Sequence, residues 1–359
     1  MRTAAVAAIA VLICACGGAP GSTGQATLPA SSTRTSSPLP TSSPVSSLPP
    51  VARAAFPPCK LPYLKGAISD THLIGGFVQG PGGKWTTDPA GGITHSGDFY
   101  LTDVKPALRG SAFSSDDSGS YDLAIKRWLP VRRDQVRGDG LAYVYAEPYK
   151  AKPSDLLNNA TRMHVISPGS GSDRVIYSGA PRGVRAYERE GVYVTSVTYY
   201  AGEGGGGLWR LDPATGASTR IPNVEKGWIE AVDHGIAWTD GASIMPRSLL
   251  RINLSTGSQA TWAHVGDEGW IGFVGLTSKG NPLVVVNRIG ASEPTAELFK
   301  YTSPTVRTLI APLSFRQSAV TDNHGTWLTG ADGIYLLDPS DKLAKVSDVT
   351  GGIVAGGCN

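Results

Sequence analysis

The sequence predicts an all-β fold, a β-propeller, from three observations. A strand–turn–strand unit occurs twice, as GLWRLDPATGASTRI at 207–221 and LRINLSTGSQATW at 250–262, with Arg251 standing 41 residues after Arg210. Glycine (45 residues) and proline (26) are frequent, while charged residues make up only 17% of the chain, which favours short strands over long helices. A glycine followed by an apolar strand recurs at steps of 51, 44, 45 and 45 residues. All-β repeats of this length are typical of propellers.

The N-terminus predicts export. Residues 1–15 begin with one positive charge, Arg2, followed by a small apolar run that is too short to span a bilayer and fits a secretory signal. The run ends in Ile13-Cys14-Ala15-Cys16-Gly17, which resembles the bacterial lipobox. The resemblance implies that Cys16 is acylated, although Cys14 stands where Ser, Ala or Thr is usual. A plain cleaved signal peptide is the alternative.

Residues 16–56 predict a disordered tether. From 19 to 50 the chain consists mostly of Ser, Thr, Pro, Gly and Ala, with Arg34 as its one charge. Such a segment buries too little apolar surface to offset the entropy lost on ordering. We therefore expect a propeller domain at 57–359, exported and anchored to the outer face of the bacterial cell membrane by a lipid.

Five blades are readable from Asp122 onwards. Each contains a glycine that joins two strands by a tight turn with a polar residue before it, and each ends in an outer hairpin. The glycines are Gly140, Gly191, Gly235, Gly280 and Gly325. Besides the two repeated copies, the outer hairpins are 163–177, 298–310 and 334–346.

The two ends of the chain predict a sixth blade that closes the ring. The strand at 352–355 has no hairpin after it, whereas residues 61–130 supply strands without a clear first one. Joined, they leave no open sheet edge in the circle. Six blades are favoured; a count of seven would take 75–88 and 98–128 as separate blades. Cys59 lies just before the first strand of the domain and Cys358 just after the last, and in an exported protein they are expected to form a disulfide.

Once these repeats are read, the domain resembles secreted bacterial β-propellers of the broad TolB-like and YncE-like kind, in which repeats of the form LxRLDPxTG are common. The resemblance covers about residues 57–359 and implies the fold. It implies no single activity, because propellers with such repeats are enzymes, ligand binders and scaffolds.

The candidate ligand site lies at the mouth of the central channel, in the loops that enter the innermost strands. Two of these loops share the sequence Gly-Trp-Ile and carry Trp228 and Trp270, and equivalent loops carry Arg182, Arg185 and Arg316. Aromatic and charged side chains together suit a sugar, a peptide or another polar ligand. The alternative is that both tryptophans pack between neighbouring blades.

Catalytic residues remain unknown from the sequence, which contains no GxSxG, HExxH or CxxC motif. The net charge is +3 without a dense Lys/Arg run, so no nucleic-acid partner is expected, and Arg132-Arg133 is interpreted as an exposed turn. No cofactor is identified. A divalent metal belongs only to the alternative function described next.

We expect a monomeric binding or scaffolding propeller that contacts the membrane through its lipid and an envelope protein or small polar ligand at the channel mouth. The alternative is a metal-dependent hydrolase or lyase resembling lactonases or streptogramin lyases. Three or more carboxylate, Asn or His side chains converging in the channel would favour that enzyme.

Overall fold

The computed structural model describes residues 51–66, 72–95, 99–101, 119–152, 160–196, 206–224, 227–240, 245–267, 269–288, 295–316 and 318–358. All of them belong to one compact unit, Leu48–Asn359. The signal segment at 1–15, the lipidation candidate Cys16 and almost all of the tether lie outside the described residues, so these assignments stay predictions. Within the described part of the chain, no helix has the length and apolar character needed to cross a membrane.

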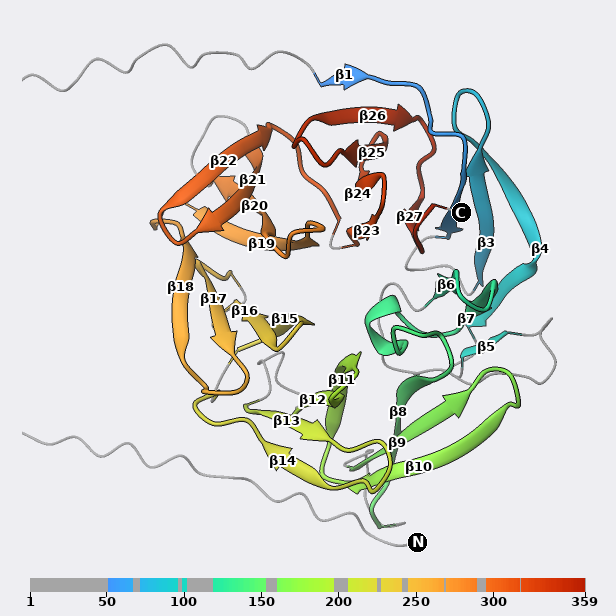
Figure 1. Ribbon diagram of the computed structural model, residues 1–359, viewed down its shortest axis with the longest axis vertical. Helices are drawn as coiled ribbons and strands as arrows, with labels where there is room; N and C mark the ends of the chain where they lie inside the picture. Colours follow the sequence, from blue (N-terminus) through green and yellow to red (C-terminus); the bar gives the residue numbers. More distant parts are fainter. Residues whose placement is uncertain are drawn as a thin grey trace, which may run out of the picture. The chain divides into compact units, whose positions relative to one another are not determined.

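The unit is a six-bladed β-propeller, as Figure 1 shows. The first three blades are antiparallel sheets. Blade 1 contains β2 (Lys60–Lys65), β3 (His72–Gln79), β4 (Lys84–His95), β5 (Phe99–Leu101) and the C-terminal β27 (Gly352–Val354). Blade 2 contains β8 (Tyr143–Tyr149), β9 (Ala160–Ser167) and β10 (Ser172–Gly179). Blade 3 contains β11 (Arg182–Glu188), β12 (Gly191–Ser196), β13 (Leu208–Leu211) and β14 (Ser218–Arg220).

The other three blades continue the same up-and-down order. Blade 4 contains β15 (Ile229–Asp233), β16 (Ile236–Thr239), β17 (Ser248–Asn253) and β18 (Gln259–His264). Blade 5 contains β19 (Gly269–Leu276), β20 (Pro282–Arg288), β21 (Thr295–Ser303) and β22 (Val306–Ala311). Blade 6 contains β23 (Val320–Asp322), β24 (Gly325–Gly330), β25 (Gly333–Leu337) and β26 (Leu343–Ser347), and β1 (Ala52–Arg53) adds a parallel fifth strand.

The repeated hairpins form as expected because their turns are built from side chains that bind the backbone. In the turn after β13, Asp212 Oδ1 accepts hydrogen bonds from the amides of Ala214 (2.7 Å) and Thr215 (3.3 Å). Gly216 then adopts φ +74°, a left-handed conformation that favours glycine. Asn253 performs the same role as Asp212 in the turn after β17.

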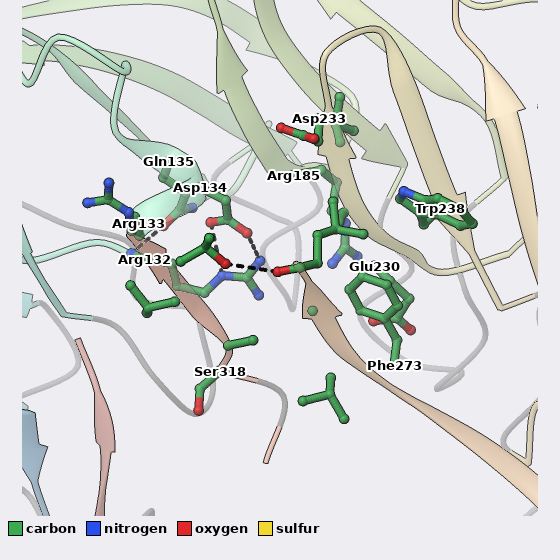
Figure 2. A pocket seen from close by; sticks show the side chains of 18 of the residues that line it. Arg132, Arg133, Asp134, Gln135, Arg185, Glu230, Asp233, Trp238, Phe273 and Ser318 are labelled. Atoms are coloured by element: carbon green, nitrogen blue, oxygen red, sulfur yellow. Dashed lines mark hydrogen bonds and ion pairs between the residues drawn. The ribbon is translucent and has the colours of Figure 1, made fainter. Parts of the chain in front are cut away.

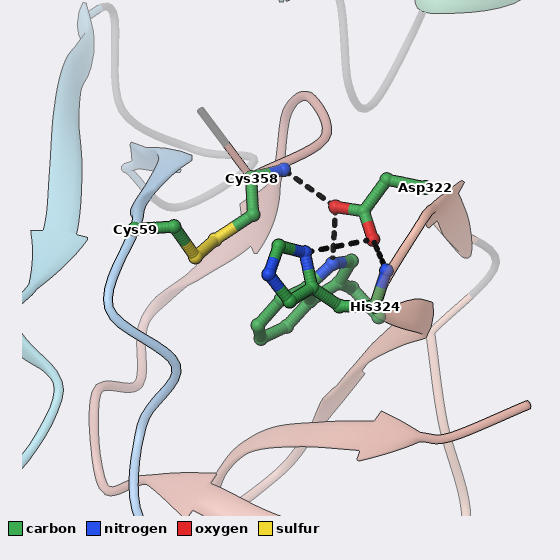
Figure 3. The surroundings of a disulfide bond; sticks show 5 residues. Cys59, Asp322, His324 and Cys358 are labelled. Atoms are coloured by element: carbon green, nitrogen blue, oxygen red, sulfur yellow. Dashed lines mark hydrogen bonds and ion pairs between the residues drawn. A yellow bond between two sulfur atoms is a disulfide. The ribbon is translucent and has the colours of Figure 1, made fainter.

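The ring closes between the chain ends, as predicted. β27 pairs antiparallel with β2, with Val354 opposite Tyr63, and Cys59 forms a disulfide with Cys358. Figure 3 shows how Asp322 supports this closure: its carboxylate accepts hydrogen bonds from the Cys358 amide (2.6 Å), from the indole of Trp327 (2.7 Å) and from the amide of His324 (2.8 Å). The C-terminus is therefore bound to both blade 1 and blade 6.

The count is six rather than seven because the described residues 119–131 make a two-stranded hairpin, β6 (Ser120–Asp122) and β7 (Arg127–Leu129), and not a further blade. This hairpin stays outside the sheet of blade 1. Tyr121 and Trp128 instead pack their rings edge to face, and the Tyr121 amide donates to the carbonyl of Ala355. The single 3-10 helix of the described residues, η1 (Arg133–Gln135), follows it.

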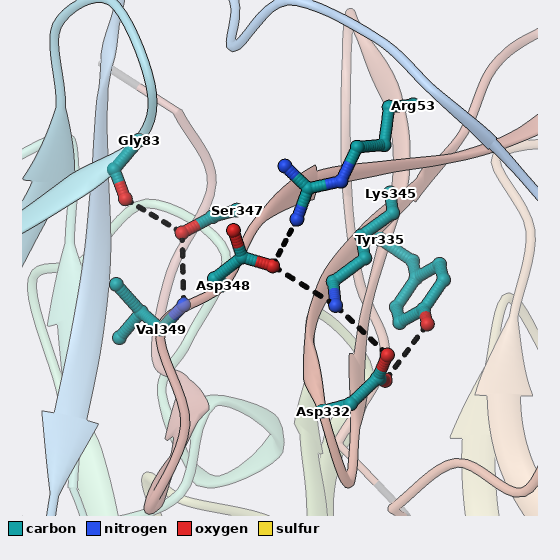
Figure 4. Close-up of polar contacts among 8 residues, drawn as sticks. All are labelled: Arg53, Gly83, Asp332, Tyr335, Lys345, Ser347, Asp348 and Val349. Carbon is teal, nitrogen blue, oxygen red and sulfur yellow. Dashed lines mark hydrogen bonds and ion pairs between the residues drawn. The ribbon is translucent and has the colours of Figure 1, made fainter.

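The strand β1 fastens the start of the described chain to the outer edge of blade 6, as Figure 4 shows. Arg53 forms an ion pair with Asp348, and Lys345 contacts both Asp348 (3.0 Å) and Asp332 (2.8 Å). Phe56, which follows β1, is buried in the apolar cluster between blades 6 and 1. The strand β1 therefore lies inside the segment 16–56 that the sequence assigned to the tether.

The apolar core lies between neighbouring blades. Val165 of blade 2 and Val192 of blade 3 belong to one buried cluster, and Leu208 of blade 3 and Ile252 of blade 4 belong to the next. Burial between faces of adjacent sheets is what holds a propeller ring together.

Several hairpin turns also contact the preceding blade, and we call these the turn contacts. The Gly216 turn lies against the carbonyl of Ile176 in blade 2, where Arg174 Nη1 donates to the carbonyl of Ala214 (2.9 Å). The others are Gly257 with Pro222, Gly83 with Ser347, and Asp341 with Lys300. The turn sequence that repeats in the chain therefore also joins one repeat to the next.

Candidate functional site

A cavity of about 1300 Å³ occupies the central channel. Its wall is formed by the innermost strands β11, β15, β19 and β23, by η1, and by the C-terminal β27. Figure 2 shows charged side chains from η1 on one side of this pocket and from β11 and β15 on the other. The channel mouth that the sequence predicts as a site is thus part of a large, partly charged cavity.

Two charged side chains reach the cavity because the innermost strands bulge. The pairing of β11 with β12 shifts between Val184 and Ala186, which leaves Arg185 without a partner in the ladder. The pairing of β15 with β16 shifts in the same way at Glu230. A β-bulge turns one residue away from the alternating pattern, and bulges are frequent beside functional sites.

Arg185 lies deep in the cavity. Its Nε donates to Thr195 Oγ1 (3.1 Å), and its guanidinium lies 5.7 Å from the ring centroid of Trp228. Protein surrounds the guanidinium, although the cavity leaves the residue partly exposed. Burial lowers the pKa of Arg185, and the nearby Arg132 lowers it further. The carboxylate of Glu230 acts in the opposite direction but does not cancel these effects.

The opposite wall is the η1 segment. Arg132 binds the carboxylate of Asp134 with both Nε (3.1 Å) and Nη2. The buried Gln135 side chain accepts a hydrogen bond from the Arg132 amide (3.0 Å), which fixes the turn. Arg133 is exposed at the cavity wall. Arg132-Arg133 is a turn, as interpreted from the sequence, with Arg133 exposed and Arg132 half-buried, but the sequence did not indicate that this turn lines the central cavity.

The structure brings Trp228, Arg182 and Arg185 to the same cavity. Trp228 is half-buried just before β15, and its amide donates to Asp240 Oδ1 (3.1 Å). The guanidinium of Arg182 stacks on the aromatic rings of blades 2 and 3, 4.6 Å from the centroid of Tyr177 and 4.5 Å from that of Trp209. Arg182 thus joins two blades at the rim of the cavity.

Trp270 and Arg316 lie elsewhere. Trp270 is half-buried and lines a smaller cavity of about 240 Å³ between blades 4 and 5, together with Asp240 and Phe315. Arg316 is exposed and lines neither cavity. Glu230 contributes to both cavities, so the two tryptophans have one carboxylate in common but do not face one another in a single cavity.

Acidic groups gather where the innermost strands β11 and β15 end. Burial raises the pKa of Glu188, and the neighbouring Asp233 raises it further. The exposed His234 donates a hydrogen bond from Nδ1 to the Asp233 carboxylate (2.7 Å), and this bond raises the pKa of the imidazole. Asp233 and His234 also line the cavity.

Among the described residues, three His, Cys, Asp or Glu side chains come close enough to share an ion in one place, at Cys59, His324 and Cys358. Two of these residues form the disulfide, and none of the three lines the central cavity. The convergence that would favour a metal-dependent enzyme is therefore not seen among the described His, Cys, Asp and Glu side chains of the channel.

Sequence reasoning missed Glu230 and the Arg132–Asp134 pair. A charged residue three positions before the end of an apolar innermost strand was the available signal, since Arg185 and Glu230 precede Glu188 and Asp233 by the same interval. The equivalent residue in β19 is Val274, which is buried. Blades 3 and 4 therefore carry a charge at the bulge where blade 5 has an apolar residue.

No family model and no curated protein matches the chain. Among solved structures, a protein from Lactobacillus plantarum is similar at 12% identity over 82% of this chain and 98% of that one, with a TM-score of 0.46. Prolyl oligopeptidase B from Galerina marginata is similar at 12% identity over 78% of this chain and 41% of that one (TM-score 0.45). A putative TolB from Agrobacterium tumefaciens is similar at 10% identity over 71% and 80% (TM-score 0.36). The pairing of its own strands establishes this chain as a six-bladed β-propeller.

Proposed function

We propose that the protein is a binding or scaffolding propeller that takes a small polar ligand or part of an envelope protein into its central channel. The observation that carries this proposal is the cavity of about 1300 Å³, whose wall combines the half-buried side chains of Trp228 and Arg185. Concave sites that combine an aromatic surface with a few fixed polar groups are typical of ligand binding.

We further propose that the propeller is exported and held at the outer face of the bacterial cell membrane by a lipid on Cys16. The lipobox-like sequence and the Ser/Thr/Pro-rich segment after it support this location. The intact mass of the exported protein tests it: an acylated N-terminus at Cys16 is expected. A mature N-terminus at any other residue would show that the anchor is assigned wrongly.

Binding is tested by ligand-detected NMR with a panel of free amino acids, dipeptides, neutral monosaccharides and organic acids. We expect at least one class to bind the wild-type domain and to lose affinity in Trp228→Ala. Trp270→Ala is the matched comparison, because it removes an equally large side chain from the smaller cavity. If every ligand that binds the wild type binds Trp228→Ala and Trp270→Ala with unchanged affinity, neither cavity is the binding site.

A further inference from the structure

We propose that the ligand of the central cavity is a small hydroxylated monocarboxylate, such as a sugar acid, whose carboxylate binds the guanidinium of Arg185 while its ring lies against Trp228. This inference rests on the proposed binding function and specifies the chemical class of the ligand. It follows from three features of the cavity wall: a cation without an ion pair, the charges around it, and two buried hydroxyls.

The first feature is the incomplete pairing of Arg185. Within the described part of the chain, its hydrogen bond goes to a neutral hydroxyl, Thr195 Oγ1, through Nε, and no ion pair or hydrogen bond is formed by its two Nη groups. A guanidinium remains charged in proteins, and an enclosed charge without a counter-ion is costly. The two free Nη groups form a planar fork that matches the two oxygens of a carboxylate.

The second feature limits the charge of the ligand. Arg132 is already occupied by Asp134, which it binds through two nitrogens. The carboxylates of Glu230 and Asp134 lie near enough to Arg185 to act on it electrostatically, yet neither contacts it. One additional negative charge would complete the pairing of Arg185. A dianion such as phosphate would be repelled by the two carboxylates.

The third feature is a pair of hydroxyl groups in the cavity wall. Ser120, on β6, is 2% exposed, and Ser318 stands just before β23. Both Oγ atoms are buried, and within the described residues neither has a hydrogen-bond partner. Buried polar atoms without partners are uncommon in proteins, and a ligand that carries several hydroxyls would supply them. This feature favours a hydroxylated acid over an aromatic or fatty acid.

The experiment measures dissociation constants of D-glucuronate, its methyl ester, D-glucose, benzoate and inorganic phosphate by calorimetry and ligand-detected NMR. The proteins are the wild type, Arg185→Gln, Arg185→Lys and the control Arg307→Gln. Arg307 stacks on Phe299 in blade 5 and lines neither cavity, so its replacement removes an equal charge away from the site. Thermal melts without ligand verify that each variant is folded.

We expect glucuronate to bind about 10- to 100-fold more tightly than glucose or the methyl ester, the range for a charged hydrogen-bonded pair. Arg185→Gln should abolish this preference, Arg185→Lys should retain part of it, and Arg307→Gln should leave it unchanged. Equal affinity for glucose and glucuronate, or a preference that survives in Arg185→Gln, overturns the carboxylate assignment.

Other results separate this inference from the proposed function. If phosphate binds more tightly than glucuronate, the ligand is not limited to a single negative charge. If benzoate binds as tightly as glucuronate, the ligand does not need hydroxyl groups. If neutral members of the panel bind in a Trp228-dependent manner while the acids do not, the binding function stands and this inference fails. If nothing binds through Trp228, both fail.

Discussion

The turn contacts predict that Gly216 is more sensitive to substitution than its backbone conformation alone requires. In Gly216→Ala, a methyl group enters at φ +74° and lies 2.3 Å from the carbonyl oxygen of Ile176 in the preceding blade. Gly235→Ala is the matched control, because Gly235 has φ +76° and no atom within 4 Å of the added Cβ. The two variants share the conformational cost and differ only in the contact between blades.

The magnitudes follow from these numbers. A left-handed conformation costs a residue with a Cβ about 1 to 2 kcal/mol, which both variants lose. In Gly216→Ala the turn and blade 2 must also separate by roughly 1 Å, and such overpacking costs about 1 to 3 kcal/mol more. For a domain of about 300 residues, that additional loss lowers the melting temperature by roughly 2 to 5 °C.

The assay is urea unfolding and thermal melting of the two variants, followed by circular dichroism. We expect Gly216→Ala to be less stable than Gly235→Ala by the additional loss. Arg174→Ala, which removes a hydrogen bond to the same turn, should weaken that turn contact too and reduce the penalty of Gly216→Ala in the double variant. Equal stabilities of Gly216→Ala and Gly235→Ala would refute the idea that the turn joins the blades.

Three further predictions concern the ring closure and the exposed histidine. Asp322→Asn should destabilise the domain by about 1.5 to 3 kcal/mol in urea unfolding, because the carboxylate accepts three hydrogen bonds from N–H donors. Cys59→Ser/Cys358→Ser should cost up to about 5 kcal/mol, since the disulfide spans 299 residues, and reduced wild type should match it under urea. An NMR titration should place the pKa of His234 above 6.5 and return it towards 6.5 in Asp233→Asn. Because the pKa of His234 is raised in the folded state, the His234–Asp233 pair stabilises the domain fully below pH 6.5 and loses this contribution as the pH rises through the folded pKa. The contribution should be small, since the imidazole is 90% exposed.

The fold could be predicted because each propeller blade is determined by residues that lie close together in the sequence. The turn at Asp212 depends on residues within a few positions of one another. The same is true of the turn glycines at the start of each second strand, which have positive φ in the structure. The closure could also be predicted, since the strand at 352–355 and Cys358 lack partners nearby in the chain.

The site was harder to predict because its geometry depends on deviations from the repeat. Alternation of side chains along β11 and β15 does not show where a bulge turns Arg185 or Glu230 into the channel. Trp228 and Trp270 occur in matching loops but line different cavities, because the neighbouring blades differ. Arg132 lines the cavity from the turn that begins η1, which has no counterpart in the other blades among the described residues.

The disulfide between Cys59 and Cys358 makes the chain from 59 to 358 a covalent circle. A protease that cuts one surface loop between these residues opens the circle into a line but releases no fragment. The cut domain should therefore keep its ring while oxidised, with each half held by the apolar faces of adjacent blades, and should separate into two pieces on a gel only after reduction. In a medium that contains proteases, such a molecule tolerates a single break that would divide a linear chain.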